Sequence, residues 1–250
     1  MIPTPIRQVL LTIQSNGVQA LLMGGQACVF YGAAQVSKDI DFVLLADTEN
    51  YARLHHALTE LQAERIAVPP FDPAVLARGH AVHFRCRAPG VEGLRVDVMT
   101  RLRGVPDFAT LWERRTTYQD VGGAVYHLLS VPDLVQAKKT QRAKDWPMIE
   151  LLVAIHFREN TAAPTPEWIQ FWLAEARTPE LLVQLRQRFP AEANAMRATR
   201  SLLALAEGGN LDALRSALDT EVRAAQAEDR AYWEPLRREI EGFRREERQT

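Results

Sequence analysis

The sequence predicts an α+β fold, in which a mixed β-sheet with flanking helices is followed by an all-helical C-terminal region. Short apolar stretches with strand-like alternation occur within the first 130 residues or so, separated by stretches with helical spacing. Beyond them the chain is polar and its apolar residues keep helical spacing only. We therefore expect two domains, an α/β core over residues 1–130 and a helical domain over residues 131–250.

The composition is that of an ordinary globular protein. Of the 250 residues, 47% are hydrophobic and 24% are charged, which suffices for one sizeable core or two modest ones. The formal net charge of −1 gives no overall basic field of the kind that accompanies extended nucleic-acid binding. We expect a cytoplasmic protein with no membrane role, because no apolar run of membrane-spanning length and no signal-peptide pattern occurs. Cys28 and Cys86 lack metal-binding spacing, so we expect buried, reduced thiols.

The first elements are expected to be a helix, a strand and a second short helix. Apolar residues over 6–13 have the i, i+3, i+4, i+7 spacing of an amphipathic helix. An apolar strand follows over 18–23, and Gly24-Gly25 predicts a turn. A brief helix over 26–31 then begins directly after the turn. Its free backbone N–H groups are suited to a phosphate, and the glycines allow a triphosphate to approach the backbone closely.

The next strand, beginning at Asp39, has two acids on one face. Side chains alternate along a strand, so Asp39 and Asp41 point the same way while Ile40 and Phe42 point into a core. Two carboxylates a few Å apart repel each other, and a divalent cation removes that repulsion. Hard oxygen ligands at this spacing suit Mg²⁺, which typically takes one or two carboxylates together with water and substrate phosphates. The pair therefore predicts a metal site beside the glycine turn.

The remaining elements of the core follow from capping residues, prolines and alternation. Asp47 or Thr48 caps a crossover helix, and the prolines of residues 68–73 predict a loop. The runs 81–87 and 94–99 predict neighbouring antiparallel strands, and Gly122-Gly123 predicts a hairpin. We expect helices over 48–61 and 107–114, hairpin strands over 116–119 and 125–129, and later helices over 132–144, 147–159, 167–176, 179–189, 191–207 and 219–248.

Gly24-Gly25 followed by Asp39-Ile40-Asp41 resembles the signature of the DNA polymerase β-type nucleotidyltransferase superfamily. In that superfamily a third metal-binding carboxylate lies on a later strand. Asp97 is the candidate, because Val96 and Val98 face away from it in the same apolar run. The resemblance implies a nucleotidyltransferase-type mixed sheet that holds Mg²⁺, with Mn²⁺ as the alternative ion, on these three carboxylates.

A second segment, Pro132 to Asp145, resembles the lysine-bearing helix and the Arg-x-Lys-Asp stretch of the AbiEii-like bacterial branch, which includes toxins of toxin–antitoxin pairs. The resemblance implies a phosphate contact for Lys138 and a binding or organising role for Arg142 and Asp145. Helix capping is an equally good explanation of Asp145, and solvent exposure of Lys138. Lys38, next to Asp39, joins the glycines as a further candidate for nucleotide binding.

The resemblance implies an enzyme that transfers a nucleoside monophosphate from an NTP to an acceptor, which is a small molecule, a protein or tRNA. The nearly neutral charge favours the first two over tRNA. The alternative is a catalytically silent binding module or toxin–antitoxin component, acting with a partner protein or a second copy of the chain. The histidines have no zinc-binding pattern, and we expect surface or packing roles for them, as for Trp168, Trp172 and Trp233 in a core or interface.

Overall fold

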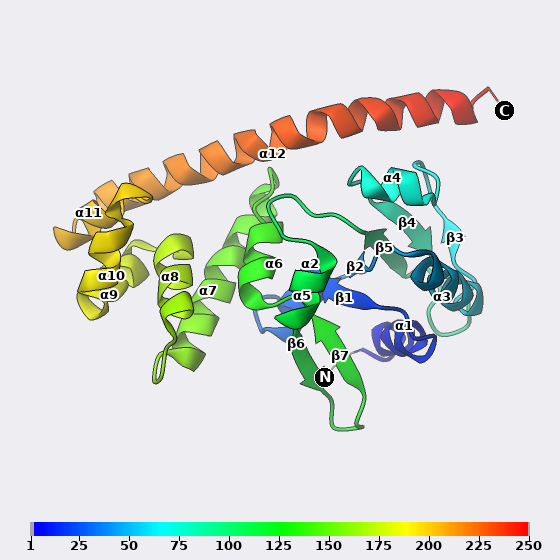
Figure 1. Ribbon diagram of the computed structural model, residues 1–250, viewed down its shortest axis with the longest axis horizontal. Coiled ribbons are helices and arrows are strands. Elements are labelled where there is room, and N and C mark those ends of the chain that lie inside the picture. The colour runs from blue at the N-terminus through cyan, green and yellow to red at the C-terminus, as the bar shows by residue number, and fades with distance from the viewer. Residues whose placement is uncertain (1–2, 250) are drawn as a thin grey trace. The chain divides into compact units, whose positions relative to one another are not determined.

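The computed structural model describes residues 3–249 and has an α+β architecture (Figure 1). A mixed sheet of seven strands with flanking helices is followed by a helical C-terminal region, which confirms the predicted fold class at that level. The described chain divides into two compact units. The first comprises the described residues up to Phe30, Ala34–Ala137 and the stretch from Tyr232 on, and the second comprises Tyr31–Ala33 and Lys138–Ala231.

The sheet belongs to the first unit and has the strand order β3-β4-β5-β2-β1-β7-β6. Strands β2 and β5 pair in parallel, as do β1 and β7, while the other neighbours are antiparallel. The predicted antiparallel pair β4 and β5 and the hairpin β6 and β7 are confirmed, whereas the two-residue β3 was not expected. The strands are β1 (Ala20–Met23), β2 (Asp39–Leu44), β3 (Glu64–Arg65), β4 (Val82–Arg85), β5 (Arg95–Met99), β6 (Thr116–Gln119) and β7 (Val125–Leu128).

Three helices of the first unit begin at a capping aspartate. Asp47 accepts a hydrogen bond from the backbone N–H of Asn50 at 2.7 Å and so starts α3, as expected. Asp72 and Asp107 start α4 and α5 in the same way, although α4 was not expected. The helices are α1 (Thr4–Ser15), α2 (Gly24–Phe30), α3 (Thr48–Glu60), α4 (Pro73–Ala77), α5 (Phe108–Glu113) and α6 (Val131–Ala137).

Asn50 ties the first turn of α3 to the two central strands. Its side-chain amide is buried, donates to the carbonyls of Gln19 and Leu45 at 3.0 and 2.9 Å, and accepts from the N–H of Gln19 at 2.7 Å. Gln19 precedes β1 and Leu45 follows β2, so one side chain satisfies the backbone where both strands meet the helix. This contact fixes the ends of β1 and β2 relative to each other, and β2 carries two of the candidate carboxylates.

The last turns of α12 (Leu211–Glu247) also belong to the first unit. The Glu239 carboxylate accepts from Nε2 of the fully buried His80 at 2.9 Å and from Nε of Arg78 at 2.7 Å, and both contacts lower the pKa of Glu239. Phe243 packs edge-on against the His80 ring. The helix begins eight residues earlier than the expected start at 219, and these contacts give its polar C-terminal part a fixed place in the first unit.

The second unit is entirely helical in its described part. Its core includes Trp172, which is fully buried and donates from Nε1 to Nδ1 of His156 at 2.9 Å, so the expected core role of this tryptophan is confirmed. Besides the first part of α12, its helices are α7 (Trp146–Asn160), α8 (Pro166–Glu175), α9 (Pro179–Arg188), α10 (Pro190–Ala195) and α11 (Leu203–Glu207), with short 3₁₀ turns at Ala143–Asp145 and Met196–Ala198.

The single helix expected over 191–207 is wrong, because the chain breaks into α10, a 3₁₀ turn and α11. The break places Arg200 inside the unit, where it is 7% exposed. Its guanidinium donates to the carbonyls of Leu173 and Ala176 at 2.8 and 2.9 Å. Both carbonyls lie at the end of α8, where backbone acceptors have no partner within the helix. Arg200 therefore caps α8 from a distance, which an unbroken helix would not allow.

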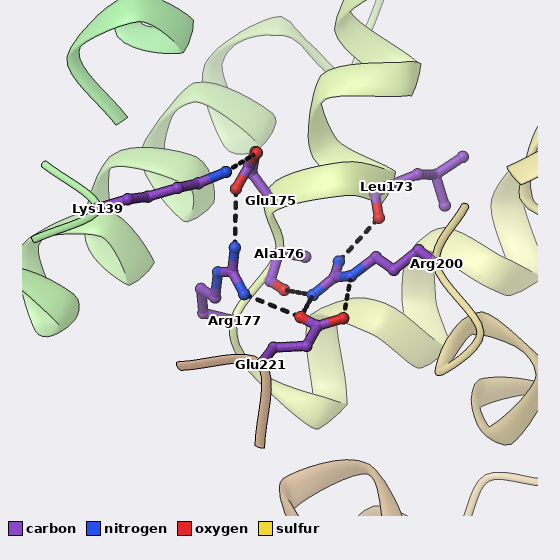
Figure 2. A network of polar contacts seen from close by, with 7 residues as sticks. All are labelled: Lys139, Leu173, Glu175, Ala176, Arg177, Arg200 and Glu221. Atoms are coloured by element: carbon purple, nitrogen blue, oxygen red, sulfur yellow. Dashed lines mark hydrogen bonds and ion pairs between the residues drawn. The ribbon is translucent and has the colours of Figure 1, made fainter. Parts of the chain in front are cut away.

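Arg200 is one member of a network of charged side chains within the second unit (Figure 2). Glu221 of α12 accepts from Arg200 at 2.8 Å and from Arg177 at 2.9 Å. Arg177 also binds Glu175, which in turn accepts from Lys139. The network joins the end of α8, the turn before α11 and the first half of α12, so alternating charges connect three segments of the second unit.

The two cysteines are buried and form no disulfide within residues 3–249, as expected, and burial raises the pKa of the Cys86 thiol to about 11. This thiol is therefore protonated at neutral pH. Within residues 3–249, no helix has the length and apolar character needed to cross a membrane.

Asn50→Ala should lower the free energy of unfolding by about 1–3 kcal/mol, because it removes the side-chain partner of the part-buried Gln19 N–H and Leu45 carbonyl. Urea denaturation monitored by circular dichroism measures the loss. His56→Ala, on the exposed side of the same helix, is the control and should shift the midpoint little. Equal shifts in the two variants would show that Asn50 does not fix the strand ends.

Candidate functional site

The three candidate carboxylates share one face of the sheet. Asp39 and Asp41 alternate along β2 with buried residues, as predicted. Strand β5 runs parallel beside β2 with Asp41 opposite Asp97, and register partners point to the same side of a sheet. The structure thus brings together acids that are 56 residues apart in the sequence, and it does so on two neighbouring strands in the middle of the sheet.

Gly24 is required by the close approach of Asp41. The two residues lie next to each other because Met23 is the register partner of Asp41 in the antiparallel pair β1 and β2. Gly24 has a φ of +67°, and a Cβ at this position would lie 1.9 Å from Oδ2 of Asp41. No other residue fits here without displacing the carboxylate or straining the backbone. The first glycine therefore serves the acid directly.

The second glycine makes room for a neighbouring side chain. A Cβ at Gly25 would lie 2.6 Å from Oγ of Ser37, which itself donates to the carbonyl of Asp39 at 2.9 Å. Both glycines belong to the first turn of α2, so the separate turn expected before the helix is wrong. The space beside the glycines was expected to admit a phosphate. In this structure the side chains of Asp41 and Ser37 occupy it.

Gln26, directly after the glycines, is an unexpected polar residue of the site. It is 1% exposed, and neither its amide nitrogen nor its amide oxygen has a hydrogen-bond partner within residues 3–249. A buried polar group without a partner typically costs about 1–3 kcal/mol. The sequence does not indicate that a glutamine in the first turn of a helix is buried without hydrogen-bond partners, so only the structure identifies Gln26.

Asp97 is held by two basic residues that the sequence did not single out. Arg95, two residues earlier on β5, donates from Nε to Oδ1 at 2.7 Å and from Nη2 to Oδ2 at 2.8 Å. His83 is the register partner of Asp97 on β4, and its Nδ1 lies 2.8 Å from Oδ1 and 3.0 Å from Nη2 of Arg95. The expectation that the histidines serve only in packing or at the surface is wrong for His83. For Arg95 the sequence did offer a signal, because a basic residue two positions before Asp97 on one strand lies on the same face.

Arg95 lies in the electrostatic field of the whole acidic face. Its pKa is raised, chiefly by the hydrogen bonds to Asp97 and further by the charges of Asp97, Asp39 and Asp41, against the opposing effect of burial. Its side chain is 38% exposed, whereas that of Asp97 is 11% exposed. One guanidinium thus compensates part of the charge of three carboxylates.

The donor set suits Mg²⁺ in residue type, because three carboxylates on one sheet face supply hard oxygen ligands. The contacts in the structure serve another purpose, since both oxygens of Asp97 accept from Arg95. Within the described residues 3–249, no three His, Cys, Asp or Glu side chains converge closely enough to hold a metal ion. The residues therefore fit a divalent cation on the condition that Asp97 exchanges its guanidinium partner.

A cavity of about 580 Å³ opens near the other end of the same strands. Its walls include Leu45 and Ala46 after β2, and Thr100 and Arg101 after β5. None of the candidate carboxylates lines it. Since Asp39 begins β2 and the cavity follows its end, the acidic face and the cavity are separate features of the first unit.

The remaining candidates divide between the units. Lys38 is exposed directly before β2 in the first unit. Lys138, Arg142 and Asp145 belong to the second unit, where they contact one another. The Asp145 carboxylate is 1% exposed and accepts from Nζ of Lys138 at 3.2 Å, from Oγ1 of Thr140 at 2.6 Å and from Nε of Arg142 at 2.8 Å.

The helix expected over 132–144 is wrong beyond Ala137. Lys138 and the residues after it fold around Asp145, and the backbone N–H of Gln141 donates to Asp229 at 2.8 Å. These local bonds replace the helical ones, so Lys138 does not stand on a helix face. Asp145 makes no side-chain capping bond to α7, and its capping role is therefore also wrong.

The pKa of Asp145 reflects the balance of these contacts. Burial raises the pKa, but the charge of Lys138, the hydrogen bond from Thr140 and the charge of Arg142 outweigh burial, and the net pKa is lowered. A carboxylate whose pKa is lowered by folding stabilises the folded state above its ordinary pKa of about 3.9, and the stabilisation disappears as the pH falls through the folded value.

Comparison with known proteins identifies no family. No protein-family model matches the chain, and no curated protein matches it either. The similarity to nucleotidyltransferases therefore depends on the glycine and aspartate motifs and on the segment from Pro132 to Asp145.

Gly24→Ala should destabilise the protein more than Gly93→Ala. Both glycines have a positive φ, so both variants carry the backbone penalty of about 1–2 kcal/mol. Nothing lies within 4 Å of a Cβ at Gly93, whereas the Gly24 variant must also displace Asp41, which adds about 1–3 kcal/mol. Urea denaturation measures both losses. Equal losses would show that Asp41 does not pack on this backbone.

Asp145→Asn should lower the free energy of unfolding by about 3–5 kcal/mol near neutral pH, because it leaves buried Lys138 without its charge partner. The difference from the parent should shrink as the pH falls below the ordinary carboxyl pKa of about 3.9, where the unfolded parent takes up the proton, and should be lost as the pH falls through the lowered pKa of folded Asp145. Denaturation at a series of pH values measures this trend, with exposed Glu159→Gln as the control. A difference independent of pH would contradict a lowered pKa.

Proposed function

We propose that this chain is a metal-dependent nucleotidyltransferase that moves a nucleoside monophosphate from an NTP to an acceptor. The proposal depends above all on the register of β2 and β5, which aligns Asp41 with Asp97 and leaves Asp39 on the same face. The close contact between Gly24 and Asp41 is the second support, because it links the glycine motif to the acid motif physically. A nucleotidyltransferase-type sheet is part of the same proposal.

In this proposal the three aspartates hold Mg²⁺ or Mn²⁺. When bound, such ions stabilise the charge on the transferred phosphoryl group and on the attacking and leaving oxygens. Asp97 lies next to Asp41 and is oriented by Arg95 and His83, so its carboxylate is placed to accept the proton of an acceptor hydroxyl.

The nucleotide contacts are proposed for Lys38 and for the backbone at Gly24 and Gly25. Lys38 is exposed beside the acidic face and supplies a flexible positive charge. Gly24 and Gly25 contribute through their backbone, since side chains already fill the space of their missing Cβ atoms.

For the second unit we propose an organising role of Asp145 within its own segment. Lys138 is 5% exposed and bound to Asp145, and Arg142 binds the same carboxylate with a side chain that is 59% exposed. The exposed guanidinium makes Arg142 the candidate of this segment for a phosphate contact.

The acceptor is proposed to be a small molecule or a protein. The net charge of −1 provides no general attraction for RNA, although tRNA remains an acceptor to test because the AbiEii-like branch resembles this chain. A bacterial cytoplasmic setting, and a partner protein or second copy of the chain, belong to the same resemblance.

One observation favours the alternative of a silent binding module. Both oxygens of Asp97 already have partners within the chain, and no three metal-binding side chains converge within the described part of the chain. A site that has lost its metal would be stabilised by such an arrangement. The alternative predicts nucleotide binding without transfer, which makes it testable in the same assay.

Asp41→Asn should reduce transfer of label by at least about 100-fold, because it removes one of the proposed metal ligands. The parent is incubated with α-labelled NTPs, Mg²⁺ and cell extract, and label is followed on RNA, protein and small molecules. The control Glu64→Gln removes a carboxylate from the edge strand β3 and should leave transfer unchanged. Undiminished transfer in Asp41→Asn would end the catalytic assignment.

Melting temperatures measured on the same protein with NTPs and Mg²⁺ distinguish the silent binding module from the enzyme. A ligand at about 100 times its dissociation constant adds roughly 2.7 kcal/mol to stability. A melting temperature raised by an NTP with Mg²⁺, combined with no label transfer by the parent, would favour the binding module over the enzyme.

A further inference from the structure

Arg95 occupies the place in the charge balance that a metal ion would take. Its guanidinium binds Asp97 through two parallel bonds of 2.7 and 2.8 Å, the strongest geometry for an arginine and a carboxylate. Its register partner on β2 is Asp39, and the charges of all three aspartates raise its pKa. Part of the negative charge of the acidic face is therefore compensated within the chain.

A divalent cation and Arg95 compete for the same oxygens. Both oxygens of Asp97 accept from the guanidinium, and the Oδ1 atom also lies 2.8 Å from His83. The Asp97 carboxylate becomes available to a cation only when Arg95 withdraws. The Arg95 side chain is 38% exposed, so it has a path into solvent.

We propose that Arg95 is an internal counter-ion that competes with the divalent cation for Asp97, so that Arg95 limits metal binding in the absence of nucleotide. This inference depends on the proposed function for the identity of the competing ion. A released guanidinium is a good bidentate ligand for phosphate oxygens. A triphosphate that takes up the released Arg95 would therefore favour metal binding, and by reciprocity the metal would favour the triphosphate.

The acidic face thus selects the metal–nucleotide complex over the metal alone. Without nucleotide, a cation must break two charge-assisted bonds to reach Asp97. With nucleotide present, the guanidinium exchanges one anionic partner for another. Metal and nucleotide are then expected to bind cooperatively, and the coupling should depend on Arg95.

Arg95→Gln should bind Mn²⁺ at least about tenfold more tightly than the parent when no nucleotide is present, because the competing charge is gone. Electron paramagnetic resonance of free Mn²⁺ gives the dissociation constant without any activity measurement. In EDTA the variant should melt at a lower temperature than the parent, since three carboxylates then lack their counter-ion, and Mn²⁺ should restore the loss.

Arg85→Gln is the matched control. Arg85 is the register partner of Arg95 on β4 and is exposed, so this variant removes the same charge from the same part of the sheet. It should leave Mn²⁺ affinity nearly unchanged. Equal tightening in both variants would mean a general charge effect and would overturn the competition.

Arg95→Lys keeps the charge but removes the paired bonds, so it should bind Mn²⁺ with intermediate affinity, and it replaces the glutamine variant if that variant does not fold. Affinity equal to the parent in both Arg95 variants would overturn the inference. No Mn²⁺ binding by the parent or any variant would overturn the proposed function as well. Tighter binding in Arg95→Gln without label transfer by the parent would support the counter-ion and reject the enzyme.

Discussion

Repulsion among three carboxylates on one sheet face is the constraint on which the site depends. Near a protein surface, two like charges a few Å apart raise the free energy by several kcal/mol. Arg95 reduces this repulsion, because its guanidinium binds Asp97. The pKa of Arg95 is raised by Asp97 and further by the charges of Asp39 and Asp41. The parallel pairing of β2 and β5 places Asp97 opposite Asp41, which creates the repulsion. The same pairing places Arg95 opposite Asp39, so the positive charge lies on the same sheet face as the three acids.

The backbone around this face is fitted to the acids. Gly24 leaves room for the Asp41 carboxylate, and Gly25 leaves room for Ser37, which in turn binds the backbone of Asp39. Asn50 fixes the chain before β1 and after β2 through three hydrogen bonds. The carboxylates therefore stand on strands whose ends and neighbours are determined.

Local patterns in the sequence were sufficient for the elements and insufficient for their partners. Period-two alternation predicted that Asp39 and Asp41 share a face, and capping predicted the start of α3 at Asp47. Alternation does not reveal which strands become neighbours, so it did not predict the pairing of β2 with β5, and the resemblance implied only that Asp97 joins the other two acids. The contact of His83 with Asp97 depends on the pairing of β4 with β5, which a local pattern does not reveal. The end of α6 at Ala137 likewise depends on side-chain contacts, because Lys138 binds Asp145.

Two acid–base pairs of similar chemistry differ in how readily they can be exchanged. The Lys138–Asp145 pair has side chains that are 6% and 2% exposed, and separating it would leave a buried charge without a partner. In the Arg95–Asp97 pair the side chains are 38% and 11% exposed, so the guanidinium can move into solvent while Asp97 stays in place. Exposure of the cation, more than strength of the bond, decides which pair is structural and which can give way to a ligand. By this criterion Asp145 organises its segment, and Asp97 remains available for chemistry.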